Sequence, residues 1–285
     1  NKENLNNISE TILNNINDLN FDDTTIKNSI VGITVGSRGI NKISNIIKTV
    51  SEYIKSKGGK PVIIPSMGSH GGGQVEEQIK ILESLGIKES KLNIDIIKSI
   101  ETKLIGFSDG DIPVYCNKKA LEVDYIIVVN RIKPHTDFTG EIESGICKML
   151  AVGLGSYKGA ETTHKYALNI GYEEVIKKIA SLMIKKLPII FALGIVENGY
   201  GKVDEVKAIM PENIIKKEKK LLIRSKKNIL RLPFDDIDVL IIKEIGKNIS
   251  GTGMDTKIVG RIMVKGHKEP KKPNIQRIVV FDLTN

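Results

Sequence analysis

Short β-branched runs alternate with amphipathic segments along most of this sequence, and that alternation restricts the chain to the α/β class. Residues 29–35 (SIVGITV) predict a buried strand that ends at Gly36. Residues 43–57 predict a helix, and residues 61–64 predict the next strand. Further strands are expected at 93–97, 113–115, 125–129 and 189–195, and further helices at 6–19, 74–85 and 172–183. We therefore expect a mostly parallel, Rossmann-like sheet with helices on both faces.

A second unit is expected after a charge-rich helix at residues 211–227. Beyond Pro233 the sequence predicts a new strand at 239–242, a glycine-rich loop at 246–253 and a strand-like run at 277–283. We predict an N-terminal catalytic and cofactor-binding domain over residues 1–232 and the beginning of a C-terminal α/β domain over 233–285. The missing initiator Met and the end directly after a strand suggest that the second domain is incomplete.

Composition narrows the class of protein. With 40% hydrophobic and 27% charged residues, the chain is typical of a globular protein. No run approaches the roughly 18 apolar residues of a membrane span, and the polar start does not resemble a signal peptide. Cys116 and Cys147 form no metal or disulfide pattern, which favours the reducing cytoplasm.

The net charge of +9 favours an anionic partner. The lysines are dense on predicted helices, where they indicate a solvated face rather than a nucleic-acid motif. Aromatic residues make up 5% of the chain and Trp is absent, so there are few platforms for stacking bases. We therefore expect a small anionic molecule as the partner, with no nucleic acid and no membrane, and leave the oligomeric state open.

Glycine, arginine and histidine residues follow three of the predicted strands. The segments are GSRG at 36–39, GSHGGG at 68–73 and NRIKPH at 130–135. Ligands of open α/β sheets bind beyond the carboxyl ends of the strands. We therefore expect Arg38, His70 and His135 to converge at one crevice.

These residue types suit the binding and proton chemistry of a small acid. Histidine serves as a base near neutral pH or as a neutral ligand for a transition metal, and arginine binds a carboxylate through two hydrogen bonds. His70 has no apolar stripe to join, and His135 follows Pro134 in a strand-end loop; both are predicted to be functional. His164 is expected near the start of a helix, and His267, in a Lys/Pro-rich segment, at the surface.

The segment at residues 140–155 (GEIESGICKMLAVGLG) is the most unusual of the chain. Lys148 lies among apolar residues, and a buried lysine is costly unless it is paired or used chemically. Pairing with Glu141 or Glu143 is the structural alternative. The backbone around Gly153, Gly155 and Ser156 is a candidate cradle for a phosphate, although it is not a Walker A loop.

Taken in order, these segments resemble the nickel-dependent lactate racemase family. The matching segments are GSRG at 36–39, MGSHGG at 67–72, KPHTDFTGEIESGICKMLAVGLG at 133–155 and GAETTH at 159–164. The later GKNISGTGMD at 246–255 resembles a glycine loop in one branch of that family. Members racemise or epimerise 2-hydroxy acids by moving a hydride onto and off a nickel-pincer pyridinium mononucleotide.

The resemblance implies a role for each candidate residue. Lys148 would carry the cofactor through a thioamide, and His164, sixteen positions later, would complete the nickel coordination. His70 and His135 would act as the paired acid and base, and Arg38 would hold the substrate carboxylate. Activity should then fall on the acid side as the imidazoles become protonated.

The chain departs from the family pattern in two places. A few extra residues separate His135 from Lys148, and DFTGEIESG replaces a hydrophobic Gly-Ser-Gly-Gly run, which puts the substrate's identity in doubt. The polar C-terminal residues of the family have no clear match, and Lys247 and Arg261 are candidate substitutes. Two other functions stay open: a zinc hydrolase with a three-histidine site, and a non-catalytic protein that binds a nucleotide or organic anion.

Overall fold

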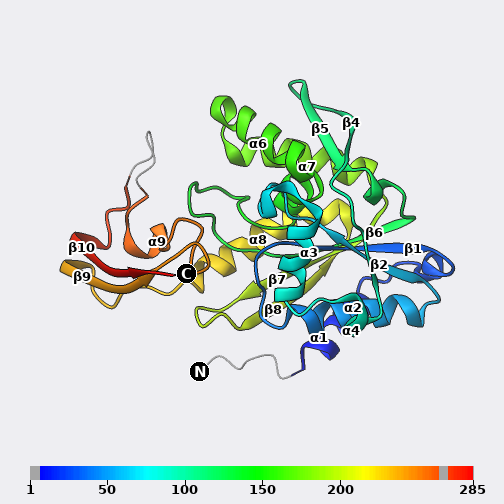
Figure 1. Cartoon of the computed structure of the whole chain (residues 1–285), viewed down its shortest axis with the longest axis horizontal. Helices are drawn as coiled ribbons and strands as arrows, with labels where there is room; N and C mark the ends of the chain where they lie inside the picture. The colour runs from blue at the N-terminus through cyan, green and yellow to red at the C-terminus, as the bar shows by residue number, and fades with distance from the viewer. Residues whose placement is uncertain (1–6, 263–268, 285) are drawn as a thin grey trace.

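A six-stranded sheet forms the centre of the computed structural model, which describes residues 7–262 and 269–284 (Figure 1). The strand order is β3-β2-β1-β6-β7-β8, and all neighbours are parallel except β8, which is antiparallel to β7. The strands are β1 (Ile30–Val35), β2 (Lys60–Pro65), β3 (Asp95–Ile96), β6 (Tyr125–Arg131), β7 (Ile189–Glu197) and β8 (Val203–Ile209). The predicted mostly parallel α/β sheet is confirmed.

The strand order reverses between β1 and β6. Gly32 of β1 pairs with Val62 of β2 on one side and with Ile126 of β6 on the other. The chain adds β2 and β3 outward from β1, then returns to place β6 on its opposite edge. A ligand crevice is expected at such a reversal, beyond the carboxyl ends of the two strands.

Helices cover both faces of the sheet, and each face has its own apolar core. In β6, Ile126 and Val128 belong to one core, whereas Ile127 and Val129 belong to the other. The first core includes residues from α5 (Ile146–Lys148), α7 (Tyr172–Lys186) and α8 (Ile214–Lys227). The second includes residues from α1 (Ile8–Asn17), α2 (Ile43–Ser56), α3 (Val75–Ser84) and α4 (Glu89–Leu92). This burial on both faces explains why the strands are continuous apolar runs.

A hairpin outside the main sheet was not expected. β4 (Thr102–Ser108) and β5 (Ile112–Asn117) pair antiparallel, so the strand predicted at 113–115 belongs to this hairpin rather than to the parallel sheet. Gly110 and Asp111, at the turn, both have positive φ angles. An Asp-Gly turn is a hairpin signal, and it is the feature that indicates β4 in the sequence.

The C-terminal segment forms a separate parallel pair of strands. β9 (Asp236–Ile245) pairs with β10 (Asn274–Leu283), and the short helix α9 (Thr256–Val259) lies between them in the sequence. Figure 1 shows this pair, in orange and red, to one side of the main sheet. His267 lies outside the described residues. None of the helices in the described ranges has the length and apolar character to cross a bilayer.

Candidate active site

The predicted residues follow the carboxyl ends of three neighbouring strands, at the reversal of strand order. Arg38 follows β1, His70 follows β2 and His135 follows β6. The charge of Lys148 acts on the pKa of both histidines, and the charge of Arg38 acts on His70 and on Lys148. Arg38 and Lys148 are therefore within electrostatic range of His70, and Lys148 is within electrostatic range of His135.

His70 begins a 3₁₀ turn (His70–Gly73) in which Gly71 and Gly72 have positive φ angles of 68° and 61°. Glycine adopts this backbone freely, which is why the turn contains three of them. The His70 ring nitrogen Nδ1 lies 3.0 Å from the carbonyl oxygen of Met67. Burial lowers the pKa of His70, the Met67 carbonyl opposes that change, and the charges of Arg38, Lys148 and Lys247 add to it.

His135 lies in the irregular segment between β6 and α5. Its Nδ1 accepts a hydrogen bond from the backbone N–H of Asp137 at 3.1 Å, and its ring stacks on Phe138 with centroids 4.5 Å apart. Burial lowers the pKa of His135 to about 3, and the charges of Lys148, Lys257 and Lys133 contribute. The imidazole is therefore neutral at pH 7.

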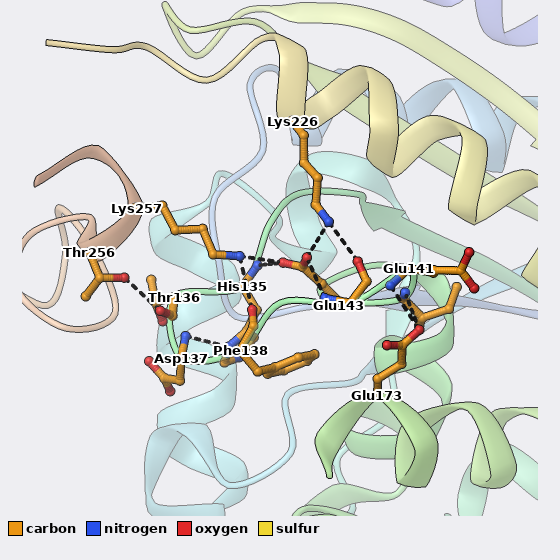
Figure 2. Close-up of polar contacts among 12 residues, drawn as sticks. His135, Thr136, Asp137, Phe138, Glu141, Glu143, Glu173, Lys226, Thr256 and Lys257 are labelled. Carbon is orange, nitrogen blue, oxygen red and sulfur yellow. Dashed lines mark hydrogen bonds and ion pairs between the residues drawn. The ribbon is translucent and has the colours of Figure 1, made fainter. Parts of the chain in front are cut away.

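Glu143 holds the loop that carries His135 (Figure 2). Its side chain is fully buried, and it accepts the backbone N–H of His135 at 2.6 Å and that of Gly140 at 3.0 Å. Two ammonium groups neutralise it, Lys226 at 2.6 Å and Lys257 at 2.8 Å. These hydrogen bonds outweigh burial and keep the pKa of Glu143 below its ordinary value. The carboxylate is thus ionised and closes the loop from His135 to Gly140.

Lys148 has no such partner. Both predicted acidic partners are used elsewhere: Glu143 by two other lysines, and Glu141 by Lys219 at 2.5 Å. Within residues 7–262 and 269–284, the ammonium group of Lys148 makes no hydrogen bond or ion pair. Burial lowers its pKa to about 8, with help from the charges of Lys133 and Arg38 and against that of Asp137. The structural alternative of pairing with Glu141 or Glu143 is wrong, and Lys148 is left as a mostly buried amine without an ion pair in the described part of the chain.

The helix that follows Lys148 is a π-helix (Met149–Leu154), which then joins α6 (Ser156–Ile170). Gly153 and Gly155 lie in this helical stretch rather than in an open loop, and both are buried. A Cβ on Gly153 would lie 2.8 Å from the carbonyl oxygen of Ser66, and one on Gly155 would lie 2.4 Å from that of Ala151. Close packing therefore accounts for these glycines, and a contact of this backbone with a phosphate stays a prediction.

Ser156 remains unusual. It is buried and has a φ angle of 51°, a left-handed conformation that a non-glycine residue adopts at a cost. Such strain, together with a π-helix, is commonest at functional positions. Ser156 stays a candidate cofactor contact.

His164 lies in the middle of α6, not near the start of a helix as expected. Its Nδ1 lies 2.9 Å from the hydroxyl of Tyr172, and the two rings meet edge to face with centroids 5.6 Å apart. Tyr172 stacks on Phe138, which stacks on His135. A run of aromatic rings therefore connects His164 to His135. The Tyr172 hydroxyl contacts Nδ1 of His164, which leaves Nε2 for a ligand.

The C-terminal segment contributes Lys247 but not Arg261. Arg38 donates a hydrogen bond to the carbonyl oxygen of Lys247 at 2.8 Å, and the charge of Lys247 acts on His70. Arg261 instead donates to the carbonyl oxygens of Gly260 and Ile275. Because its guanidinium is used within the C-terminal segment, the structure does not bring Arg261 to the other predicted residues.

Several site residues were not identified from the sequence: Lys133, Asp137, Glu143, Tyr172 and Lys257. Lys133 follows β6, and burial lowers its pKa, with the charge of Arg131 as the next cause. Its position in the sequence, two residues before His135, is the feature that could have identified Lys133 as a site residue. Glu143, Tyr172 and Lys257 carry no local signal, because their roles depend on contacts between distant segments.

His70, His135 and His164 do not form a three-ligand metal site. Phe138 and Tyr172 separate the rings of His135 and His164. Among the residues that the structure describes, no group of three or more His, Cys, Asp or Glu side chains is arranged to hold a metal ion. The zinc hydrolase alternative therefore has no ligand set in this part of the chain.

Comparison with known proteins gives a family and a fold. The family model described as the lactate racemase N-terminal domain matches residues 1–174. No curated protein matches the chain. The lactate racemase apoprotein from Thermoanaerobacterium thermosaccharolyticum has a similar structure, with a TM-score of 0.59 at 16% sequence identity. The match covers 84% of this chain and 59% of that chain, and at this identity the likeness concerns the fold.

Proposed function

Since this chain belongs to the lactate racemase N-terminal domain family, we propose that it is an isomerase that racemises or epimerises a lactate-like 2-hydroxy acid. The proposed reaction is a reversible hydride transfer to a nickel-pincer pyridinium mononucleotide attached to Lys148. The observation that carries this proposal is the state of Lys148, a mostly buried amine that makes no ion pair among the described residues and whose charge acts on two imidazoles.

The residues present fit that cofactor. An unpaired lysine whose pKa is lowered to about 8 is partly neutral under mild conditions, as formation of an amide-type bond requires. His164 offers a solvent-exposed ring whose Nδ1 is already held by Tyr172, which is typical of a metal-binding histidine. When bound, the group supplies a hydride acceptor and a nickel ion, neither of which amino-acid side chains provide.

The protein's own residues bind the substrate and move its proton. Arg38, whose guanidinium is oriented by the Lys247 carbonyl, holds the substrate carboxylate. The neutral imidazoles of His70 and His135 are available to the hydroxyl group as C2 passes through a planar 2-keto acid. Lys133 and Lys247 add positive charge around an anionic substrate.

The partner we propose is a small 2-hydroxy acid rather than a nucleic acid or a membrane. We also propose a cytoplasmic location, which the two free, buried cysteines support. A non-catalytic protein that binds a nucleotide or organic anion is the remaining alternative, because the same cations would serve it.

The decisive experiment has two parts. Intact-mass measurement of protein produced with the cofactor pathway should show an adduct that is absent from the Lys148→Arg variant. The loaded protein is then incubated in ordinary water with enantiopure 2-hydroxy acids labelled with deuterium at C2. Racemisation with retention of deuterium is expected, because a transferred hydride does not exchange with water. An adduct without any racemisation across the panel would support the binding protein, and loss of the label would contradict hydride transfer.

A further inference from the structure

We propose that Glu218 is a positioning residue of this site: its buried carboxyl group caps the helix that carries Lys148 and thereby fixes where the amine of Lys148 lies. The role of Lys148 as the point of cofactor attachment rests on the proposed function. The cap itself follows from contacts within the chain that do not depend on a cofactor.

The helix that begins at Ile146 has no cap from its own segment. The first N–H groups of a helix have no partner within it, and the residue before the helix usually supplies one with its side chain. That residue is Gly145, and its position shows no capping hydrogen bond from a side chain. Because α5 continues directly into the π-helix, the missing cap is at the start of a helical stretch that reaches Leu154. A donor at this end has to be satisfied from another part of the fold.

Glu218, on α8, supplies the acceptor. Its Oε2 accepts the backbone N–H of Cys147 at 2.8 Å, although 71 positions separate the two residues. The Glu218 side chain is fully buried. Burial raises the pKa of Glu218 to about 7, and the N–H groups of Cys147 and Ile146 act in the opposite direction. The start of the helix therefore stabilises the carboxylate, as the positive end of a helix dipole does.

Gly145 leaves the space that this carboxyl group occupies. A Cβ on Gly145 would lie 2.2 Å from Oε1 of Glu218, closer than two such atoms can approach. The φ angle of Gly145 is −175°, which is extended backbone that any residue adopts. Close approach of Glu218, rather than backbone conformation, is therefore the reason for a glycine at this position.

This contact matters for Lys148 because nothing holds its amine directly. The ammonium group makes no hydrogen bond or ion pair in the described part of the chain, so its place depends on the backbone of its helix. Lys148 follows Cys147 directly, in the first turn. On the other side of that turn, Nδ2 of Asn130, in β6, donates to the carbonyl oxygen of Gly145 at 2.7 Å. The start of the helix is thus attached to the sheet through Asn130 and to α8 through Glu218.

The chemistry of Lys148 depends on this placement. Burial is the largest cause that lowers its pKa to about 8, so the fraction of neutral amine is set by how well water is excluded from it. If the start of the helix is released, water reaches the amine and its pKa returns toward the ordinary value of 10.5. Glu218 therefore maintains the neutral amine without touching it.

Competitive labelling with acetic anhydride tests this in the full chain without cofactor. Because only the neutral amine reacts, the pH at which labelling of Lys148 is half-maximal gives its pKa, which peptide mass mapping reads for this one lysine. The unaltered chain should show a midpoint of about 8. Glu218→Met removes the acceptor and Gly145→Ala displaces it, so both should move the midpoint toward 10.5. Glu218→Gln keeps an amide oxygen for the N–H of Cys147 and should stay close to the unaltered chain.

Glu173→Met is the matched control. Glu173 also accepts backbone N–H groups, those of Glu141 at 2.9 Å and Ile142 at 3.2 Å, but it does not hold the helix of Lys148. Its replacement removes the same kind of contact from the preceding loop. The labelling midpoint of Lys148 should therefore stay at about 8 in this variant.

Two results would overturn the proposal. One is an unchanged midpoint in Glu218→Met and Gly145→Ala proteins whose circular dichroism shows that they are folded. The other is an equal rise in Glu218→Gln or Glu173→Met, which would mean that any change in this region exposes Lys148. If Glu218→Met does not fold, Gly145→Ala decides, because it leaves the carboxyl group in the chain and alters only its approach to the helix.

Cofactor loading gives an independent readout. In protein produced with the cofactor pathway, intact mass should show a smaller fraction of adduct for Glu218→Met and Gly145→Ala than for Glu218→Gln, which should match the unaltered chain. If the unaltered chain forms no adduct, the proposed function fails, whereas the labelling midpoints still decide the role of Glu218.

Discussion

The carboxylate of Glu143 lies 2.8 Å from the ammonium of Lys257, although 114 positions separate the two residues in the sequence. Glu143 is also bound to Lys226, which lies on α8. Glu143 therefore has two roles. Its buried ion pairs with Lys226 and Lys257 stabilise the fold, and its hydrogen bond to the backbone of His135 positions that residue.

Replacing Glu143 by glutamine should destabilise the protein strongly. Glu143→Gln leaves Lys226 and Lys257 without their counter-charge, and breaking a buried ion pair costs about 3–5 kcal/mol. Glu141→Gln is the matched control, because Glu141 pairs with Lys219 at the surface, where solvent screens the pair, and its replacement should cost far less. Urea denaturation at pH 7 measures both. Similar losses in the two variants would show that burial of Glu143 does not matter.

Replacing Lys148 by methionine should stabilise the protein that lacks cofactor. The pKa of Lys148 is about 8 in the folded state and 10.5 in its ordinary state, so the folded protein disfavours the cation. That cost is fully present below pH 8 and disappears as the pH rises through 10.5. We expect Lys148→Met to gain about 1–3 kcal/mol at pH 7 and to lose this advantage above pH 10. Lys217→Met, at an exposed position on α8, should change little at either pH. A destabilised Lys148→Met protein would indicate a partner for the amine.

Removing the Tyr172 hydroxyl should weaken the hold on His164. In Tyr172→Phe the ring still stacks on Phe138, but Nδ1 of His164 loses its partner. Loss of such an outer contact typically reduces metal affinity by about 10–100-fold. The nickel content of loaded protein after dialysis against a chelator measures the effect. Tyr166→Phe, which loses only a weak contact to the Asp111 carbonyl, is the control on α6 itself, and equal nickel loss in both variants would argue against a role for Tyr172.

The pH at which activity falls on the acid side should be lower than the ordinary pKa of histidine predicts. Burial and neighbouring cations lower the pKa of both His70 and His135 below 6.5. The neutral forms therefore persist into mildly acidic solution, and the expected acid-side fall of kcat/KM is displaced below pH 6.5. Initial rates between pH 4.5 and 8 locate the midpoint. A midpoint at or above 6.5 would mean that the crevice does not disfavour the imidazolium.

Stability should fall as the pH is lowered, and His135 should contribute. Its pKa is about 3 in the folded state and 6.5 in its ordinary state, so between these values the unfolded chain binds the extra proton. The contribution of His135 to stability is present above pH 6.5 and is lost progressively toward pH 3. Urea denaturation at pH 7 and pH 5 should therefore show a smaller pH dependence for His135→Gln than for the unaltered protein. The prediction fails if the two dependences are equal.

Much of this arrangement is predictable from the sequence because it depends on local patterns. The β-branched runs predict the parallel strands, and the strand ends locate Arg38, His70 and His135. Lys148 is predictable as a buried amine from its apolar neighbours. These predictions succeed because burial of a strand or a side chain is visible in the pattern of apolar residues over a short segment.

What the sequence does not predict depends on contacts between distant segments. Nothing local indicates that Glu143 pairs with Lys226 and Lys257 and thereby leaves Lys148 alone. Gly153 and Gly155 have the composition of a phosphate loop, but the close approach of Ser66 and Ala151 makes them packing positions in a helix. Arg261 follows the glycine-rich loop at 246–253 in the sequence, but its guanidinium donates hydrogen bonds to the carbonyl oxygens of Gly260 and Ile275 in its own segment.

The Glu143–Lys257 pair also bears on how this protein can be divided or recombined. The region matched by the family model ends at residue 174, so both cations that neutralise Glu143, Lys226 and Lys257, come from beyond it. A fragment that ends at residue 232 would keep His135 and Glu143 but lose Lys257, one of the two cations that neutralise Glu143. Chimeras between relatives should accordingly tolerate an exchange of C-terminal halves only where the incoming half supplies a basic side chain at the position of Lys257.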